Sequence, residues 1–279
     1  MNYEKKYFTL NNLISQKGGN NEVETCFSSI EEFSKCEYGT KIKQEQLVQN
    51  IRICIKPILN GIITRVRGDG YCMLNAVCTS LYLYMNILST QNLLERFSSS
   101  LNNCHREHNF NTTKENQNEL VNNVIRYIDS CKRLVKVKFD TISNIILQKL
   151  MLKMGMDDIN TARDTLGFQN TFDDSQPNYP FLQLGKVLSN VLDCVIISIN
   201  IDSQSLYGTY PNMIDEDMSV DTIYEKVYNG EWKVVFLINL DQRHYNSFIP
   251  VLEGAGANLP IRDISIWFFH DIKERVEWL

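Results

Sequence analysis

The clearest chemistry in the sequence lies in two short segments that are far apart along the chain. The first is the turn Arg67-Gly68-Asp69-Gly70-Tyr71-Cys72, and the second is His244-Tyr245-Asn246-Ser247-Phe248. A thiol is mostly protonated at neutral pH, so it becomes a good nucleophile only where its pKa is lowered or a base accepts its proton. We therefore predict that Cys72 is a nucleophile and that His244 is its base.

The residues around Cys72 predict a tight turn that leads into a helix. Two glycines allow the backbone before Cys72 to turn sharply, and the apolar run at residues 73–81 is typical of a buried helix. Cys72 would then stand at the helix N-terminus, where the first N–H groups have no intrahelical partner and the helix dipole is positive. Such a position stabilises both a thiolate and the oxyanion of a tetrahedral intermediate.

The residues before His244 predict the strand that positions it. Residues 233–239 are rich in β-branched and aromatic side chains, which favours a buried strand, and a turn at 240–243 leads into a second strand. Because side chains alternate along a strand, His244 and Asn246 would share one face. Asn246 can then accept a hydrogen bond from one ring nitrogen of His244, while the other nitrogen faces the thiol.

Three segments resemble the ovarian tumour (OTU) family of cysteine proteases, most of which are deubiquitinases, and their order along the chain also matches that family. Residues 68–72 resemble the Asp-Gly-x-Cys block of that family, and residues 235–247 resemble its strand-turn-His block. Residues 181–199 resemble the helix and strand that precede the His block. The resemblance implies an α+β, papain-like OTU fold, with a small central β-sheet flanked by helices.

The resemblance also implies a mechanism and a substrate. Cys72 would attack the carbonyl after the C-terminal glycine of ubiquitin, polyubiquitin or a ubiquitin-like modifier, with His244 as base and then acid. Asn246 would orient His244, and the backbone around Asp69 and Cys72 would form the oxyanion hole. Asp69 would shape that loop through its own side chain. No metal or cofactor is implied.

Some features depart from the family pattern and leave alternatives open. Leu74 stands where the family usually has an aromatic residue, Tyr71 replaces a frequent asparagine, and no ubiquitin-reading loop is recognisable. Taken alone, Cys72 could be an inert buried thiol and His244 a strand histidine with a satisfied hydrogen bond. Two other functions therefore remain: a silent module that binds ubiquitin, and a cysteine protease that acts on another protein such as a polyprotein.

Composition narrows the class of protein. The chain has 279 residues, 43% of them hydrophobic and 22% charged, which is ordinary for a folded domain. A formal net charge of -5 gives no basic footprint for nucleic acid, and no segment approaches the ~20 apolar residues that span a bilayer. Eight scattered cysteines and a start without a secretory signal favour reduced thiols in a cytoplasm, the host cytosol if the chain is a viral or bacterial effector.

The chain is predicted to contain an N-terminal extension at 1–40, an OTU-like protease domain at 41–253 and a C-terminal segment at 254–279 that packs on the core. The only other candidate site is Cys104-His105-Arg106-Glu107-His108, which lacks the matching ligand pair of a zinc site and favours a solvated loop. Helices are expected at 41–59, 72–88, 93–101, 119–136, 141–154 and 181–192, strands at 194–201, 232–239 and 244–251, and a loop at 102–118.

Overall fold

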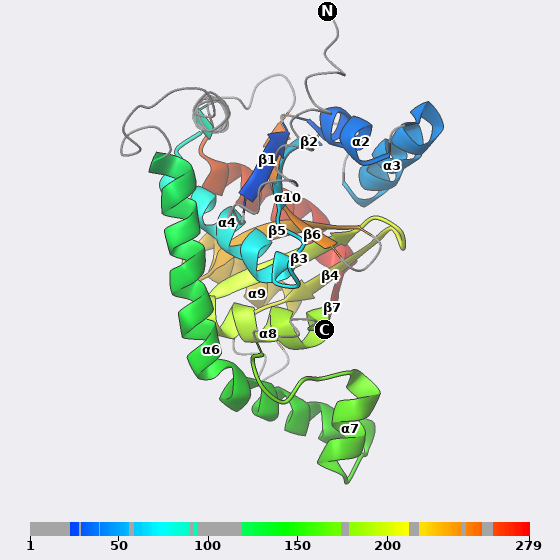
Figure 1. Ribbon diagram of the computed structural model, residues 1–279, viewed down its shortest axis with the longest axis vertical. Helices are drawn as coiled ribbons and strands as arrows, with labels where there is room; N and C mark the ends of the chain where they lie inside the picture. The colour runs from blue at the N-terminus through cyan, green and yellow to red at the C-terminus, as the bar shows by residue number, and fades with distance from the viewer. Residues whose placement is uncertain are drawn as a thin grey trace, which may run out of the picture.

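A seven-stranded mixed sheet lies at the centre of the described residues, with the order β1-β2-β6-β5-β3-β4-β7 (Figure 1). The computed structural model describes residues 23–27, 29–38, 40–55, 59–89, 92–93, 119–173, 179–211, 218–240, 244–252 and 259–279. Its strands are β1 (Val23–Phe27), β2 (Leu59–Val66), β3 (Cys194–Asn200), β4 (Ser205–Thr209), β5 (Lys233–Leu240), β6 (His244–Leu252) and β7 (Val276–Trp278). The pairs β3–β5 and β4–β7 are parallel, and the other pairs are antiparallel.

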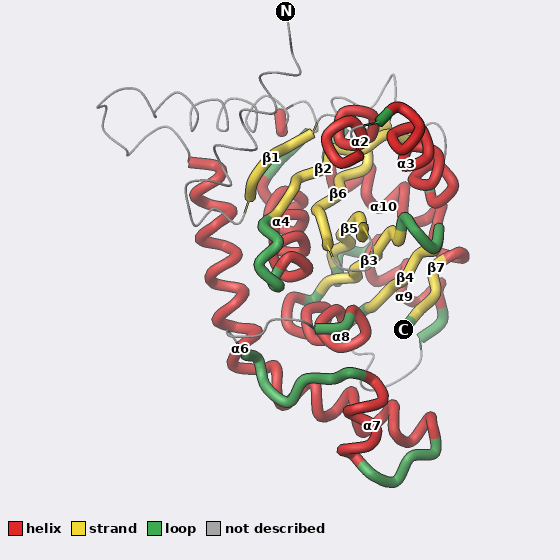
Figure 2. The backbone as a smooth tube through the Cα atoms, turned by 45° about the vertical axis from the view of Figure 1, so that its right-hand side comes forward, coloured by secondary structure: helices red, strands yellow, loops and turns green. Residues whose placement is uncertain are grey.

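Helices cover both faces of this sheet, so the protein belongs to the α+β class (Figure 2). One face packs mainly against α4 (Cys72–Asn86), α6 (Glu119–Met154) and α8 (Phe181–Leu192). The other face packs against α2 (Ile30–Tyr38), α3 (Lys41–Cys54), α9 (Val220–Tyr228) and α10 (Ile261–Ile272). Beyond α8, the end of α6 and the short α7 (Ile159–Leu166) extend away from the sheet (Figure 1).

Because helices cover both faces of the sheet, the middle of strand β5 is apolar at successive positions. Along β5, Leu237 faces the core under α4, while Phe236 and Ile238 face the core under α10. A strand that is buried on both sides needs apolar residues at every position rather than at every second one. The same alternation in β6 places Tyr245 on the α4 side and Phe248 on the α10 side.

The structure confirms the expected elements that carry the candidate site. The helices predicted from residues 72 and 181 are α4 and α8, and the three predicted strands are β3, β5 and β6. The helix expected at 41–59 ends at Cys54. No described helix combines the length and the apolar character that a membrane crossing requires.

Two predictions about elements were wrong. The helices expected at 119–136 and 141–154 are one continuous helix, α6, because the buried period runs on through Val135, Phe139 and Ser143. Strands β1, β2 and β4 were not predicted. In β2 the polar residues Asn60 and Thr64 interrupt the apolar pattern, although Thr64 is fully buried.

The two predicted terminal segments contribute to this sheet. Within 1–40, β1 pairs with β2, and Phe33 of α2 is fully buried, whereas residues 1–22 lie outside the described residues. Within 254–279, α10 buries Phe268 and Phe269, and β7 adds an edge strand beside β4. The loop expected at 102–118, with Cys104-His105-Arg106-Glu107-His108, and most of the helix expected at 93–101 lie outside the described residues.

Gly61 of β2 is required by a ring packed directly over it. A Cβ at this position would lie 1.8 Å from Cε2 of Phe248, on the neighbouring strand β6, and Phe248 is only 1% exposed. We expect Gly61→Ala to lower the free energy of unfolding by about 1–3 kcal/mol, measured by urea denaturation, because the buried ring must shift. In the double variant with Phe248→Leu, the loss should be smaller than the sum of the two single losses; strict additivity would contradict the clash.

Candidate active site

The turn before α4 is held by one glycine and one aspartate. Gly70 has a φ of 85°, a conformation that residues with a side chain adopt only under strain. Asp69 Oδ1 accepts a hydrogen bond from the N–H of Tyr71 at 2.9 Å and one from Nδ2 of Asn75 at 3.4 Å. The Asp69 carboxylate therefore ties the turn to the first turn of α4, and Cys72 is the first residue of that helix.

Cys72 lies nearly buried at the helix N-terminus, where opposing effects act on its thiol. Burial raises the pKa of the Cys72 thiol above its ordinary 9.0, and the Asp69 carboxylate raises this pKa further. Backbone N–H groups of Tyr245, Met73 and Cys72 itself donate to the sulfur and lower its pKa. The stabilisation expected from the helix N-terminus is present, but desolvation outweighs it, so the thiol is protonated at neutral pH.

The strand register brings the beginning of β6 against Cys72. The pairing of β2 with β6 ends at Thr64 and Ser247, while the pairing of β5 with β6 continues to Leu240 and His244. Two residues before Ser247 on β6, the N–H of Tyr245 donates to the Cys72 sulfur. The fold thus joins the nucleophile to Tyr245, the residue after His244, across 173 positions of sequence (245 minus 72).

The imidazole of His244 also lies against the turn that precedes Cys72. A Cβ built on Gly68 would be 3.6 Å from Nδ1 and 3.7 Å from Cε1 of His244. The Nδ1 edge of the ring therefore lies close to the backbone of the nucleophile turn, at a distance that would still leave room for a Cβ. The fold therefore places His244 against the turn that leads to Cys72, and the Asp69 carboxylate of that turn acts on the imidazole.

Asn246 is fully buried and lies on the same sheet face as His244, two residues away on β6. Its side chain interacts with the imidazole and raises the His244 pKa. Within the described residues, however, His244 Nε2 and both Asn246 amide atoms make no hydrogen bond of regular geometry. The contact between the two side chains is therefore a loose one.

The balance of effects keeps His244 neutral at physiological pH. Burial lowers the pKa of His244 below its ordinary 6.5, and the Arg65 guanidinium lowers it further, against the opposing effects of Asn246 and Asp69. The resting site therefore contains a neutral thiol and a neutral imidazole. A protonated thiol needs a proton acceptor before it can act as a nucleophile, and a neutral imidazole can be that acceptor.

Some residues that shape the site were not found from the sequence. Tyr71, beside the nucleophile, donates its hydroxyl hydrogen to the carbonyl oxygen of Asp173 at 3.0 Å. Its ring contacts that of Phe172 at 5.4 Å between centroids, and Lys132 Nζ lies 3.8 Å from the ring centroid. These contacts fix the turn to α6 and to the segment after α7, and only the position of Tyr71 next to Cys72 could have indicated them.

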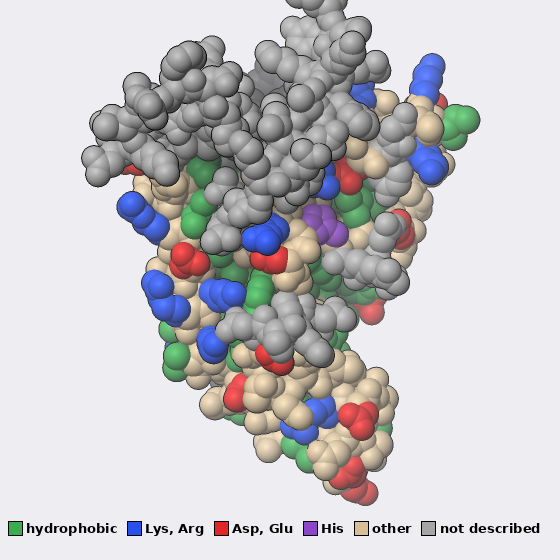
Figure 3. All heavy atoms as spheres, viewed as in Figure 1, with side chains coloured by type: hydrophobic (Ala, Val, Ile, Leu, Met, Phe, Trp, Pro, Cys, Tyr) green, Lys and Arg blue, Asp and Glu red, His purple; other side chains and the backbone are tan. Residues whose placement is uncertain are grey.

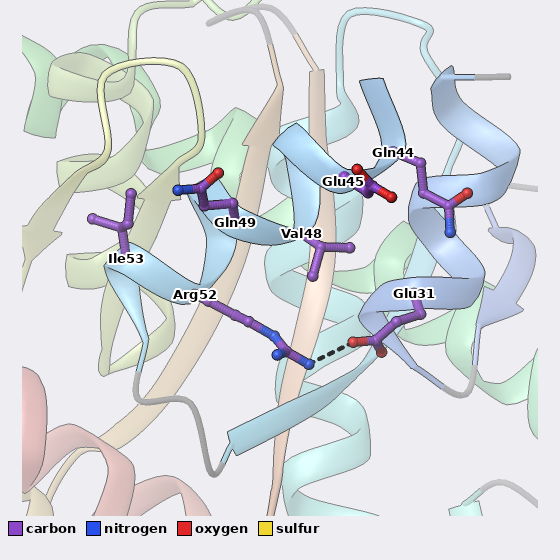
Figure 4. Close-up of a pocket in the computed structure, with 7 residues that line it drawn as sticks. All are labelled: Glu31, Gln44, Glu45, Val48, Gln49, Arg52 and Ile53. Atoms are coloured by element: carbon purple, nitrogen blue, oxygen red, sulfur yellow. Dashed lines mark hydrogen bonds and ion pairs between the residues drawn. The ribbon is translucent and has the colours of Figure 1, made fainter. Parts of the chain in front are cut away.

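A hollow of about 480 Å³ lies elsewhere, between α2 and α3, and none of the candidate catalytic residues lines it (Figure 4). Its walls are Glu31, Gln44, Glu45, Val48, Gln49, Arg52 and Ile53. Arg52 and Glu31 form an exposed ion pair across it at 2.7 Å. These residues include no thiol and no imidazole, so the hollow is separate from the chemistry considered for the Cys72 site.

The charges on the face shown in Figure 3 are mixed. Lys and Arg side chains are scattered over the α6 side of this face, with acidic side chains between them.

In the part of the chain that the structure describes, no cluster of three His, Cys, Asp or Glu side chains is placed to hold a metal ion.

No protein-family model matches the sequence, and a search of curated proteins finds no match. The likeness to the OTU family therefore rests on the three sequence segments, and membership of that family stays a prediction.

Proposed function

We propose that the protein is a papain-like deubiquitinase of the OTU type, a thiol protease that hydrolyses the peptide or isopeptide bond after the C-terminal glycine of ubiquitin or a ubiquitin-like modifier. The observation that carries this proposal is the meeting of two segments. The N–H of Tyr245 donates to the Cys72 sulfur, and Gly68 lies against the His244 ring. These contacts join the two segments that resemble the family, and this proximity supports the proposal.

The reaction follows from the neutral resting pair. The Cys72 sulfur attacks the carbonyl carbon while His244 accepts the thiol proton, and the negative charge on the carbonyl oxygen develops near the N-terminus of α4. His244 then gives the proton to the leaving amine as the C–N bond breaks, which leaves a thioester on Cys72. Water, deprotonated by His244, hydrolyses the thioester and releases the modifier with a free carboxylate.

The narrow surroundings of the sulfur favour a slim substrate terminus. Cys72 is 6% exposed, and the adjacent Tyr71 and Tyr245 are buried to a similar degree. The Tyr245 ring also stacks on Phe181 of α8 at 6.2 Å between centroids. A chain end that lacks side chains, such as the glycine end of ubiquitin, can approach a sulfur so enclosed more easily than a bulky residue can. Reduced thiol chemistry of this kind fits a cytoplasmic compartment.

The direct test is release of a fluorophore from the C-terminal amide of ubiquitin. The same fluorophore on a panel of ubiquitin-like modifiers and on unrelated peptides serves as the comparison. The proposal predicts turnover of ubiquitin or of one ubiquitin-like modifier. Cleavage confined to the peptides would indicate a protease of other proteins, and binding of ubiquitin without turnover would indicate a silent binding module.

Asn246 should matter less than the nucleophile and the base. We expect Asn246→Ala to lower kcat/KM by roughly 10- to 10³-fold, because the amide orients His244 but does not touch the substrate. Asn246→Asp, which keeps an acceptor in place, should retain more activity than the alanine variant. Equal losses in the two variants, measured by steady-state kinetics, would argue against an orienting role.

A further inference from the structure

Arg65 lies on the same face of the sheet as the catalytic histidine. Ile63 of β2 pairs with Phe248 of β6, and both belong to the core under α10. Because alternate residues of a strand share a face, Arg65 lies on that face, as do Asn246 and His244. Continuing the register by one residue places Arg65 opposite Asn246.

Arg65 is held in this position by α2. Its Nη1 lies 3.5 Å from Oε1 of Glu37, with side-chain exposures of 32% for Arg65 and 18% for Glu37. A guanidinium keeps its charge at every pH at which the protein is folded. The charge beside His244 is therefore permanent, and its partial burial limits screening by salt.

Several charged or titratable groups of the described residues act on His244. Arg65 of β2 disfavours the imidazolium, Asp69 of the nucleophile turn favours it, and the loose contact with the Asn246 side chain favours it. The Cys72 thiol at the start of α4 is neutral at pH 7, because its own pKa is raised by burial. Glu37 of α2 forms an ion pair with Arg65 and partly offsets the charge of its guanidinium.

We propose that Arg65, held in place by Glu37, is a positioning residue that keeps His244 in its neutral, proton-accepting form. The consequence for catalysis rests on the proposed function, whereas the coupling between Arg65 and His244 does not. A base must be neutral before it can accept the thiol proton, so Arg65 extends the working range of the enzyme towards acidic pH.

The coupling can be measured without a substrate. The chain has four histidines, so the imidazole signals of the full-length protein can be followed by ¹H–¹⁵N NMR, with His244 assigned from the signal lost in His244→Gln. In Arg65→Gln the titration midpoint of His244 should move upwards. At a fixed acidic pH, the ratio of protonated to neutral imidazole should rise about two- to five-fold, the range for a partly exposed charge pair.

Two further variants separate charge from structure. Arg65→Lys keeps the charge and should retain the wild-type midpoint, whereas Glu37→Gln removes the counter-charge and should move the midpoint downwards. If Arg65→Gln does not fold, Glu37→Gln still tests whether the charge of the Arg65–Glu37 pair affects the His244 midpoint. Thermal unfolding that changes in all three variants while the His244 midpoint stays fixed would show a merely structural role and overturn the proposal.

Activity supplies the second readout. For ubiquitin-tail cleavage, the acid limb of the kcat/KM profile should move to higher pH in Arg65→Gln and stay in place in Arg65→Lys. An NMR shift in a protein that does not cleave ubiquitin would leave the coupling intact and refute only the proposed function. An unmoved NMR midpoint in an active enzyme would refute the role of Arg65 alone.

Discussion

Replacement of Cys72 by alanine is expected to lower kcat/KM for a ubiquitin-tail amide by at least about 10⁴-fold, because no other group at the site can form the thioester. The fold should survive, since the change removes one buried sulfur atom and leaves the Asp69 hydrogen bonds of the turn in place. Steady-state kinetics, with a thermal melt of the same sample, provides the measurement.

Cys36 offers the matched control for this variant. It is a half-buried thiol on α2 and is not one of the candidate site residues. Cys36→Ala should therefore retain wild-type activity. Substantial turnover by Cys72→Ala, or an equal loss in both variants, would contradict the assignment of the nucleophile.

Replacement of His244 by alanine is expected to lower kcat/KM by about 10²–10⁴-fold near neutral pH, the contribution of a positioned general base. The reason lies in the thiol, whose pKa is raised above 9.0 by burial and which therefore needs a proton acceptor. Without that acceptor only the thiolate can react, and its fraction grows about tenfold for each pH unit below the thiol pKa. The residual activity of His244→Ala should therefore rise with pH more steeply than that of the wild type between pH 7 and about pH 9.

His270 provides the comparison, because it is an exposed histidine on α10 and His270→Ala should leave the pH profile unchanged. A His244→Ala enzyme with near-normal kcat/KM at neutral pH would remove His244 from the mechanism. A residual activity without the steeper rise would show that the thiol is activated by some other group.

The fold was predictable where local sequence and tertiary packing agree. Strand β5 and helix α8 carry apolar residues at most positions because both are largely buried. This composition was enough to predict a buried strand and a buried helix. In α6, the run Val-Lys-Val-Lys at 135–138 imitates the alternation of a strand, although Val137 is exposed and Phe139 continues the buried face of the helix. Strand β2 was missed because its Gly61 and buried Thr64 make sense only against the partners that cover them.

The candidate site was predictable in its residues but not in its electrostatics. The glycine turn, the helix start and the spacing of His244 and Asn246 follow from local patterns. The sequence argument for Cys72 considered the helix N-terminus, which lowers a thiol pKa, but could not give the burial, which raises it more. The effect of Arg65 was also out of reach, because it depends on how an unpredicted strand pairs with β6.

The most direct test of the account is reaction of the protein with ubiquitin that carries a thiol-reactive group at its C-terminus, followed by intact mass. The account predicts one adduct in the wild type and in Cys36→Ala, and none in Cys72→Ala. An adduct that persists in Cys72→Ala would contradict Cys72 as the nucleophile. A folded wild-type protein that forms no adduct with ubiquitin or with any ubiquitin-like modifier in the panel would contradict the proposed deubiquitinase.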